Sequence, residues 1–293
     1  MLTPAASSNP NRWAFPAMIT GSACLAFGPW LVRLADVAPL ASAFWRQALA
    51  VPFLLLLALR APVGKGLCAA GGRGLALAGL AGLAFAADLA VWHLGIMRTT
   101  LANATLLANA ATFLLPLYGL IALGLRPGRL QWWALGLAAS GMALLLGRSA
   151  EVSPRHFTGD LLCLAAALFY TIYLVAIERL RVRLDAMPAL ALATLVSALA
   201  LLPLALAGPF WPQDWTPVLA LALGSQVIGQ GLIVYAVRHL PPLIIGLSLL
   251  VQPAISAAIG AIRFGEVPGP AELAGAALVV AALLIARLPA AKA

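Results

Sequence analysis

The chain has 293 residues, of which 63% are hydrophobic and only 9% are charged, with a formal net charge of +9 and a mean hydropathy of +1.01. Soluble domains carry about 25% charged residues, so this composition excludes an ordinary soluble protein and predicts an all-α polytopic membrane protein. The basic charge is typical of cytoplasmic loops, and no basic run or stacking-aromatic module indicates nucleic-acid binding. Residues 1–12 lack the pattern of a cleaved signal peptide and are expected to form a cytoplasmic N-terminal tail.

Ten apolar stretches, each close to the roughly 20 residues that cross a bilayer, follow one another along the chain. Turn-forming and charged residues separate them. With the N-terminus inside, twelve of the 18 Lys and Arg residues fall on the inner side, which predicts that both termini are cytoplasmic. The ten transmembrane helices are expected near residues 13–34, 40–59, 74–96, 101–124, 130–148, 158–178, 188–207, 217–237, 242–262 and 270–288.

An internal repeat relates the two halves of the chain. The sequence TGSACLA from Thr20 recurs, with one gap, as TGDLLCLA from Thr158. Because each copy holds five spans, the second copy must insert upside down relative to the first. This predicts two inverted five-helix repeats, 13–148 and 158–288, an arrangement typical of transporters whose substrate site lies near the membrane midplane.

Polar residues of the third and fourth spans are the first candidates for a substrate site. Asp88 and Trp92 lie four residues apart on one helical face, and His93 points away from Asp88. A charge at membrane depth costs about 2.5–3.5 kcal/mol, so Asp88 is expected to bind a substrate amine, carry a proton or bond a neighbouring helix. His93 is expected to bind a substrate amine, to carry a proton or to lie at the outer interface. Thr105 and Asn109 share a stripe that either binds substrate or joins helices.

The second half of the chain offers amides and phenols in place of charges. Gln226 and Gln230 lie one turn apart in the eighth span, and Gln252 lies in the ninth. Amides at mid-membrane suit hydrogen bonds to a polar or zwitterionic solute, although they also join helices to one another. Tyr170 and Tyr235 offer, with Trp92, a surface for apolar or aromatic solutes.

Other features narrow the chemistry. Gly28-Pro29-Trp30 predicts a bend in the first span. Arg46, several residues into the second span, is expected to snorkel to the outer surface or to pair with an acidic group. The chain has no Walker loop, HExxH, GxSxG or His/Cys cluster, so the sequence predicts no cofactor, no metal site and no enzyme.

A set of motifs runs through both halves of the chain: Phe44-Trp45-Arg46, the stretch from Trp92-His93 through Arg98 to Asn109, Tyr235-Ala-Val-Arg238, Gln252-Pro253 and Phe264-Gly-Glu266. These motifs resemble the EamA branch of the drug/metabolite transporter superfamily. One departure is Arg126-Pro127, which stands where the first repeat should carry a Phe-Gly-Glu-like element. The resemblance implies a ten-helix exporter of amino acids, other metabolites or drugs, nearest to YddG-type exporters of aromatic and neutral amino acids.

The expected function is therefore a secondary transporter that exports small metabolites, above all aromatic or neutral amino acids, across a bacterial inner membrane by alternating access. Its partners are a small-molecule substrate, the lipid bilayer and, if transport is proton-coupled, protons. Three alternatives stay open: a drug or other metabolite exporter of the same fold, a membrane-embedded enzyme or lipid-handling protein, and a passive channel. His93 and Asp88 face apart on their helix, which disfavours a catalytic pair.

Overall fold

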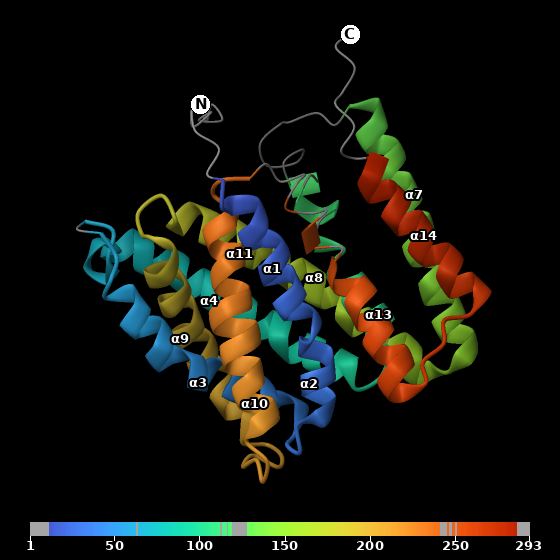
Figure 1. Cartoon of the computed structure of the whole chain (residues 1–293), viewed down its shortest axis with the longest axis horizontal. Helices are drawn as coiled ribbons and strands as arrows, with labels where there is room; N and C mark the ends of the chain where they lie inside the picture. The colour runs from blue at the N-terminus through green and yellow to red at the C-terminus, as the bar shows by residue number, and fades with distance from the viewer. Residues whose placement is uncertain are drawn as a thin grey trace.

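The computed structural model describes residues 12–62, 64–111, 113–115, 117–118, 128–240, 245, 248–249 and 251–285. This described part is helical and contains no strand (Figure 1). The expected N-terminal tail lies outside it apart from Arg12, and so does Arg126-Pro127. The elements are α1 (Ala14–Ala26), α2 (Gly28–Leu34), α3 (Pro39–Ala58), η1 (Leu67–Ala69), α4 (Gly71–Ile96), α5 (Leu101–Ala108), α7 (Arg129–Val152), α8 (Pro154–Leu180), α9 (Ala186–Ala205), α10 (Thr216–Ala220), η2 (Leu221–Gln230), α11 (Gly231–Ala236), α13 (Val251–Phe264) and α14 (Pro270–Ile285).

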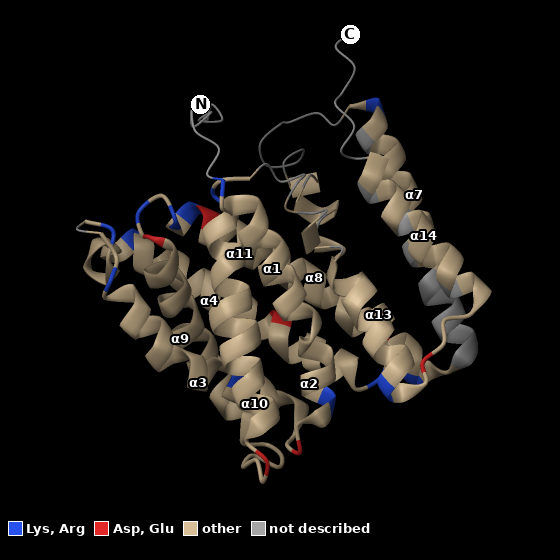
Figure 2. Cartoon of the chain, viewed as in Figure 1, with Lys and Arg blue, Asp and Glu red and all other residues tan. Residues whose placement is uncertain are grey.

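Among the described residues, six helical stretches are long and apolar enough to cross a membrane. They correspond to the first, second, third, sixth, seventh and eighth expected spans. Helices α5, α7, α13 and α14 overlap the other four expected ranges, and the ten-helix inverted repeat stays a prediction. Charged residues gather at the two ends of the bundle, with mostly uncharged helix between them (Figure 2). The six stretches are Ala14–Leu34, Pro39–Ala58, Gly71–Ile96, Pro154–Leu180, Ala186–Ala205 and Thr216–Ala236.

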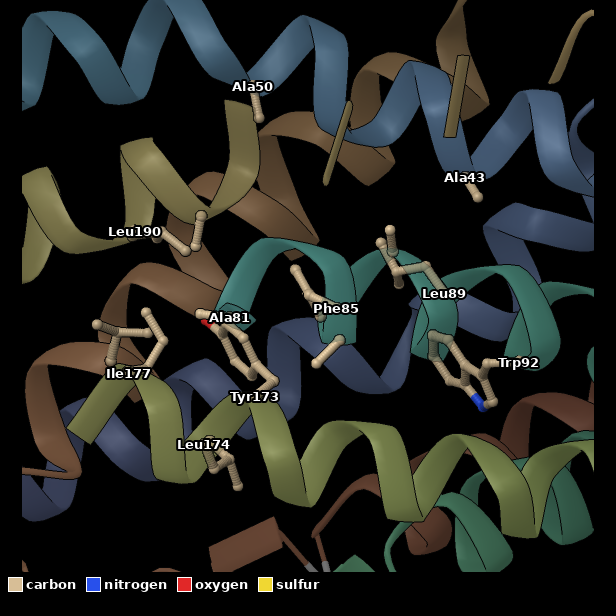
Figure 3. Close-up of a cluster of buried hydrophobic side chains, with 14 of the residues drawn as sticks. Ala43, Ala50, Ala81, Phe85, Leu89, Trp92, Tyr173, Leu174, Ile177 and Leu190 are labelled. Atoms are coloured by element: carbon tan, nitrogen blue, oxygen red, sulfur yellow. The ribbon is translucent and has the colours of Figure 1, made fainter. Parts of the chain in front are cut away.

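Helix α4 lies at the centre of the bundle. It packs mainly on α8 and α9 and also contacts α3, α2 and α5; Figure 3 shows it between α8 on one side and α3 and α9 on the other. Two glycines allow this close approach. A Cβ at Gly82 would lie 2.4 Å from the Cβ of Val196 on α9, and one at Gly95 would lie 2.6 Å from the Sγ of Cys163 on α8. Small residues at such contacts let helix backbones pack closely in a membrane.

Three irregular points in the helices shape the interior. The bend predicted near Gly28 is confirmed, because α1 ends at Ala26 and α2 begins at Gly28, with Pro29 in its first turn. Helix α5 ends at Ala108, after only eight residues, and Asn109 is its C-cap. The middle of the stretch Thr216–Ala236 is η2, a π-helical segment, and such segments occur frequently at functional sites.

Candidate functional site

A small cavity lies inside the bundle, between α1, α3, α4, α5, α8, η2 and α13. Its volume is about 40 Å³, which is room for about three water molecules at roughly 10–15 Å³ each. The wall combines two opposite charges, three amides and three aromatic rings with apolar side chains. The lining residues are Leu25, Arg46, Phe85, Asp88, Leu89, Trp92, Ala108, Asn109, Tyr170, Gln230 and Gln252.

The cavity brings together six of the ten candidate residues named from the sequence. They come from α4, the end of α5, α8, η2 and α13, so only the fold could unite all six. The other four, His93, Thr105, Gln226 and Tyr235, do not line the cavity. The six are Asp88, Trp92, Asn109, Tyr170, Gln230 and Gln252.

Asp88 is the acidic residue of the cavity. It is 6% exposed and lies on the same face of α4 as Phe85 and Trp92. Within the described residues, no hydrogen bond or ion pair joins its carboxylate to another side chain or backbone group. Trp92 beside it is held in place because its Nε1 donates to the carbonyl oxygen of Ala104 on α5, at 3.2 Å. The Asp88 carboxylate is therefore available to a ligand in the cavity.

Arg46 is the residue of the site that sequence reasoning missed. Snorkelling to the outer surface was the wrong expectation, because the whole residue is only 2% exposed and lines the cavity. Its Nε donates to Oε1 of Gln226 at 3.3 Å, and its guanidinium lies 6.0 Å from the ring centroid of Trp92. Its Nη1 is buried and has no partner among the described residues. The signals in the sequence were the FWR motif and the position of Arg46 several residues into the second span, and neither gives the direction of the side chain.

Two glutamines of η2 organise one wall of the site. Gln226 is fully buried behind Arg46, and its Nε2 donates to Oγ1 of Thr194 at 3.1 Å. Gln230 uses its Nε2 on two phenols, Tyr173 at 3.1 Å and Tyr170 at 3.4 Å. The Oε1 of Gln230 is buried and has no partner among the described residues, so it remains free to accept a hydrogen bond.

Aromatic rings form the apolar part of the wall. Phe85 of α4 stacks on Tyr173 of α8 with ring centroids 4.5 Å apart, and Tyr170 stacks on the same Tyr173 at 5.6 Å. Such stacked pairs add about 0.5–1.5 kcal/mol beyond the area they bury. The stack fixes Tyr170 and Phe85 at the cavity, where their ring surfaces can contact an apolar solute.

The remaining candidates have local partners. A hydrogen bond of 2.9 Å joins Nδ1 of His93 to Oγ of Ser42 on α3. Thr105 donates to the carbonyl oxygen of Leu101 in the preceding turn, at 2.8 Å, and Asn109 donates its Nδ2 to the Thr105 carbonyl oxygen at 2.9 Å. Tyr235 lies on α11, and its ring centroid is 5.3 Å from that of His239. Of these, only Asn109 reaches the cavity.

A second polar cluster lies at one end of the helices that line the cavity, around the turn between α4 and α5. This turn cluster consists of Arg33, Thr99, Asn103, Asp160 and Glu266. Arg33 of α2 forms an ion pair with Glu266 at 2.5 Å and donates to the carbonyl oxygens of Thr99 and Ile96. Glu266 also accepts from the backbone N–H of Leu101, at the start of α5.

Asp160 of α8 completes the turn cluster. It is fully buried and accepts hydrogen bonds from the Thr99 hydroxyl and from Nδ2 of Asn103, the latter at 3.2 Å. The cluster thus joins α2, α8 and the segment after α13 to a single turn. The sequence shows Phe264-Gly-Glu266 as a motif but does not predict that Glu266 pairs with Arg33.

Comparison with known proteins adds the family. Residues 157–288 match the family model described as the EamA-like transporter family. The second half of the chain belongs to this family. No curated protein matches the chain in sequence.

A solved structure described only as the crystal structure of a protein is similar to the whole chain. It has a TM-score of 0.68 and 21% sequence identity, and the alignment covers 95% of this chain and 97% of that chain. At this identity the likeness shows the fold alone. Residues 157–288 thus match a family of transporters rather than of enzymes, and the six apolar helices indicate a membrane protein.

Proposed function

We propose that this EamA-family protein is a secondary transporter that exports small metabolites, above all aromatic or neutral amino acids, across a bacterial inner membrane by alternating access. One observation carries the proposal: a cavity buried in the helix bundle is lined by opposite charges, amides and aromatic rings. Ionisable residues at membrane depth are expensive and usually mark a substrate or ion pathway. Those residue types match the groups of an amino acid.

Each lining group has a role in this proposal. Asp88 and the amides of Asn109, Gln230 and Gln252 bind the polar groups of the substrate, and the rings of Trp92 and Tyr170 contact its side chain. Gln226 acts from behind by orienting Arg46. The other three candidates support the helices around the site. His93 bonds Ser42, Thr105 bonds the Leu101 carbonyl oxygen, and Tyr235 packs beside His239.

The proposed membrane topology is two inverted five-helix repeats, 13–148 and 158–288, with both termini in the cytoplasm. The start of α1 and the end of α14 lie at the same end of the bundle, which supports termini on one side (Figure 1). The family model matches residues 157–288, which is nearly the whole proposed second repeat. This supports a repeat unit of that length. Inverted repeats place the substrate site between the halves, near the midplane.

The state of the cavity favours a carrier over a channel. Ligand sites commonly enclose about 300–1,000 Å³, so a cavity of about 40 Å³ must widen to admit a metabolite. The turn cluster ties together the helices at one end of the path. Release of that cluster, with closure of the opposite end, is the movement that alternating access requires.

The direct test is transport by purified protein in proteoliposomes loaded with unlabelled phenylalanine or leucine. We expect saturable counterflow of the labelled amino acid, and its loss in Asp88→Asn but not in the exposed control Glu178→Gln. Movement of nucleosides or drugs with no movement of any amino acid would contradict the substrate. Rates that do not saturate would indicate a channel, and chemical change of a lipid or solute would indicate an enzyme.

A further inference from the structure

Two opposite charges line the central cavity, and no ion pair joins them within the described residues. We propose that Arg46 is the carboxylate-binding residue of the cavity and that Arg46 and Asp88 together select a zwitterion with an apolar side chain over amines and organic acids. This inference rests on the proposed function and names the chemical class of its substrate. It assigns Arg46 a role in binding.

The guanidinium of Arg46 is held in place and only partly used. Gln226 accepts from Nε, and Thr194 in turn accepts from Gln226, so a chain from α9 through η2 fixes the head group. The face of the Trp92 ring lies 6.0 Å away, a distance suited to a cation–π contact. Nη1 is buried without a partner among the described residues. A planar guanidinium with a free donor matches the geometry of a carboxylate.

Asp88 and Gln230 offer hydrogen-bond acceptors to the same cavity. The Asp88 carboxylate has no bonded partner in the described part of the chain. The Nε2 of Gln230 is occupied by Tyr170 and Tyr173, which leaves its buried Oε1 as a second open acceptor. An ammonium group has three donors and no acceptor. Asp88 and Gln230 are therefore suited to bind the ammonium of the same ligand.

An unpaired buried charge is strongly unfavourable, and a pair of opposite charges in one small cavity would normally form an ion pair. Here Gln226 and Trp92 contact the guanidinium of Arg46, which extends from α3, while Asp88 extends from α4 and forms no ion pair with it in the described residues. A zwitterion satisfies both charges at once. An amine leaves Arg46 unsatisfied, and an acid leaves Asp88 unsatisfied. The apolar wall of Leu89, Phe85 and Trp92 favours an apolar side chain on the ligand.

The test compares three probes of similar size on the purified full-length protein by calorimetry: phenylalanine, phenethylamine and 3-phenylpropionate. The wild type should bind phenylalanine about 10- to 100-fold more tightly than either singly charged probe, since each loses one charge-assisted contact. Equal affinity for phenylalanine and for one singly charged probe would overturn the inference. This comparison needs no variant and so does not depend on a variant folding.

Variants then assign each charge to its group. Arg46→Gln should weaken the binding of phenylalanine and 3-phenylpropionate by about 10- to 100-fold and leave the binding of phenethylamine unchanged. Asp88→Asn should weaken the binding of phenylalanine and phenethylamine by about the same factor and leave that of 3-phenylpropionate unchanged. Arg46→Lys, which keeps the charge, should retain the preference for the zwitterion. The control is Arg263→Gln, an exposed arginine outside the cavity. The assignment would be contradicted if the Arg46→Gln protein folds and its affinity for all three probes falls by the same factor.

The two proposals can fail separately. A wild type that binds phenylalanine but does not distinguish it from phenethylamine would leave amino-acid transport standing and remove the role of Arg46. A wild type that binds none of the three probes, and no amino acid in counterflow, would remove the proposed function itself.

Discussion

The central cavity and the turn cluster are both buried and polar, and they differ in how their groups are partnered. In the turn cluster Arg33 donates to Glu266, Thr99 and Ile96, Glu266 also caps α5, and Asp160 accepts from Thr99 and Asn103. Within the described residues, Arg46 in the cavity has one hydrogen-bond partner and Asp88 has none. Buried polar groups in proteins are almost always satisfied, and an exception needs an explanation. We infer that the turn cluster holds one end of the helices together in this conformation and that the cavity is prepared for a ligand.

The largest effect should follow from removing both cavity charges. Arg46→Gln combined with Asp88→Asn should lower the transport of phenylalanine on the order of 1,000-fold, because both charge-assisted contacts to the ligand are lost. The melting temperature should stay constant or rise, since replacing buried charges with neutral groups is often neutral or stabilising. Counterflow checks the loss of transport, and thermal unfolding of the same preparation checks the melting temperature. A large fall in melting temperature would mean that the cavity charges are structural.

Glu266→Ala tests the opposite behaviour at the turn cluster. It leaves Arg33 without its ion pair and the Leu101 N–H without its acceptor. The loss should be about 3 kcal/mol, the low end for breaking a buried pair, because both side chains retain some exposure, 15% for Arg33 and 18% for Glu266. Thermal unfolding with Glu178→Gln as the exposed control provides the measurement. Unchanged stability would remove the distinction between the two regions.

The packing behind the turn cluster offers a smaller test on α4. Gly95→Ala places a Cβ 2.6 Å from Cys163 and 3.0 Å from the Gly159 carbonyl, next to Asp160. Overpacking of this kind should cost about 2 kcal/mol and displace α8 from the turn. Gly79→Ala is the matched control, because a Cβ at Gly79 meets nothing within 4 Å. Equal melting temperatures for the two variants would show that α4 and α8 have room to move apart.

Local pattern in the sequence was enough for part of this picture. The four-residue spacing of Asp88 and Trp92 on one helical face is a property of any α-helix, and both side chains line the cavity. The break near Gly28 also follows from local chemistry, because Pro29 is favoured in the first turn of a helix and disfavoured in its interior. Such features depend only on neighbours in the chain.

The rest depended on contacts between distant segments. Whether Arg46 snorkels or turns inward is decided by Gln226 and Trp92, which lie on other helices. The ion pair of Arg33 with Glu266 joins residues 233 positions apart. The π-helical segment that carries Gln226 and Gln230 has no compositional sign, because it uses the same apolar residues as an α-helix.

His93 gives the smallest expected effect and separates being close to the cavity from lining it. It is adjacent in sequence to Trp92 and fully buried, yet it bonds Ser42 on α3 and does not line the cavity. His93→Phe keeps a ring beside Trp92 and removes one hydrogen bond, so the loss of stability should be about 1 kcal/mol. Counterflow of phenylalanine should stay near the wild-type rate. A severe loss of counterflow at unchanged stability would place His93 in the transport path and extend that path beyond the residues that line the cavity.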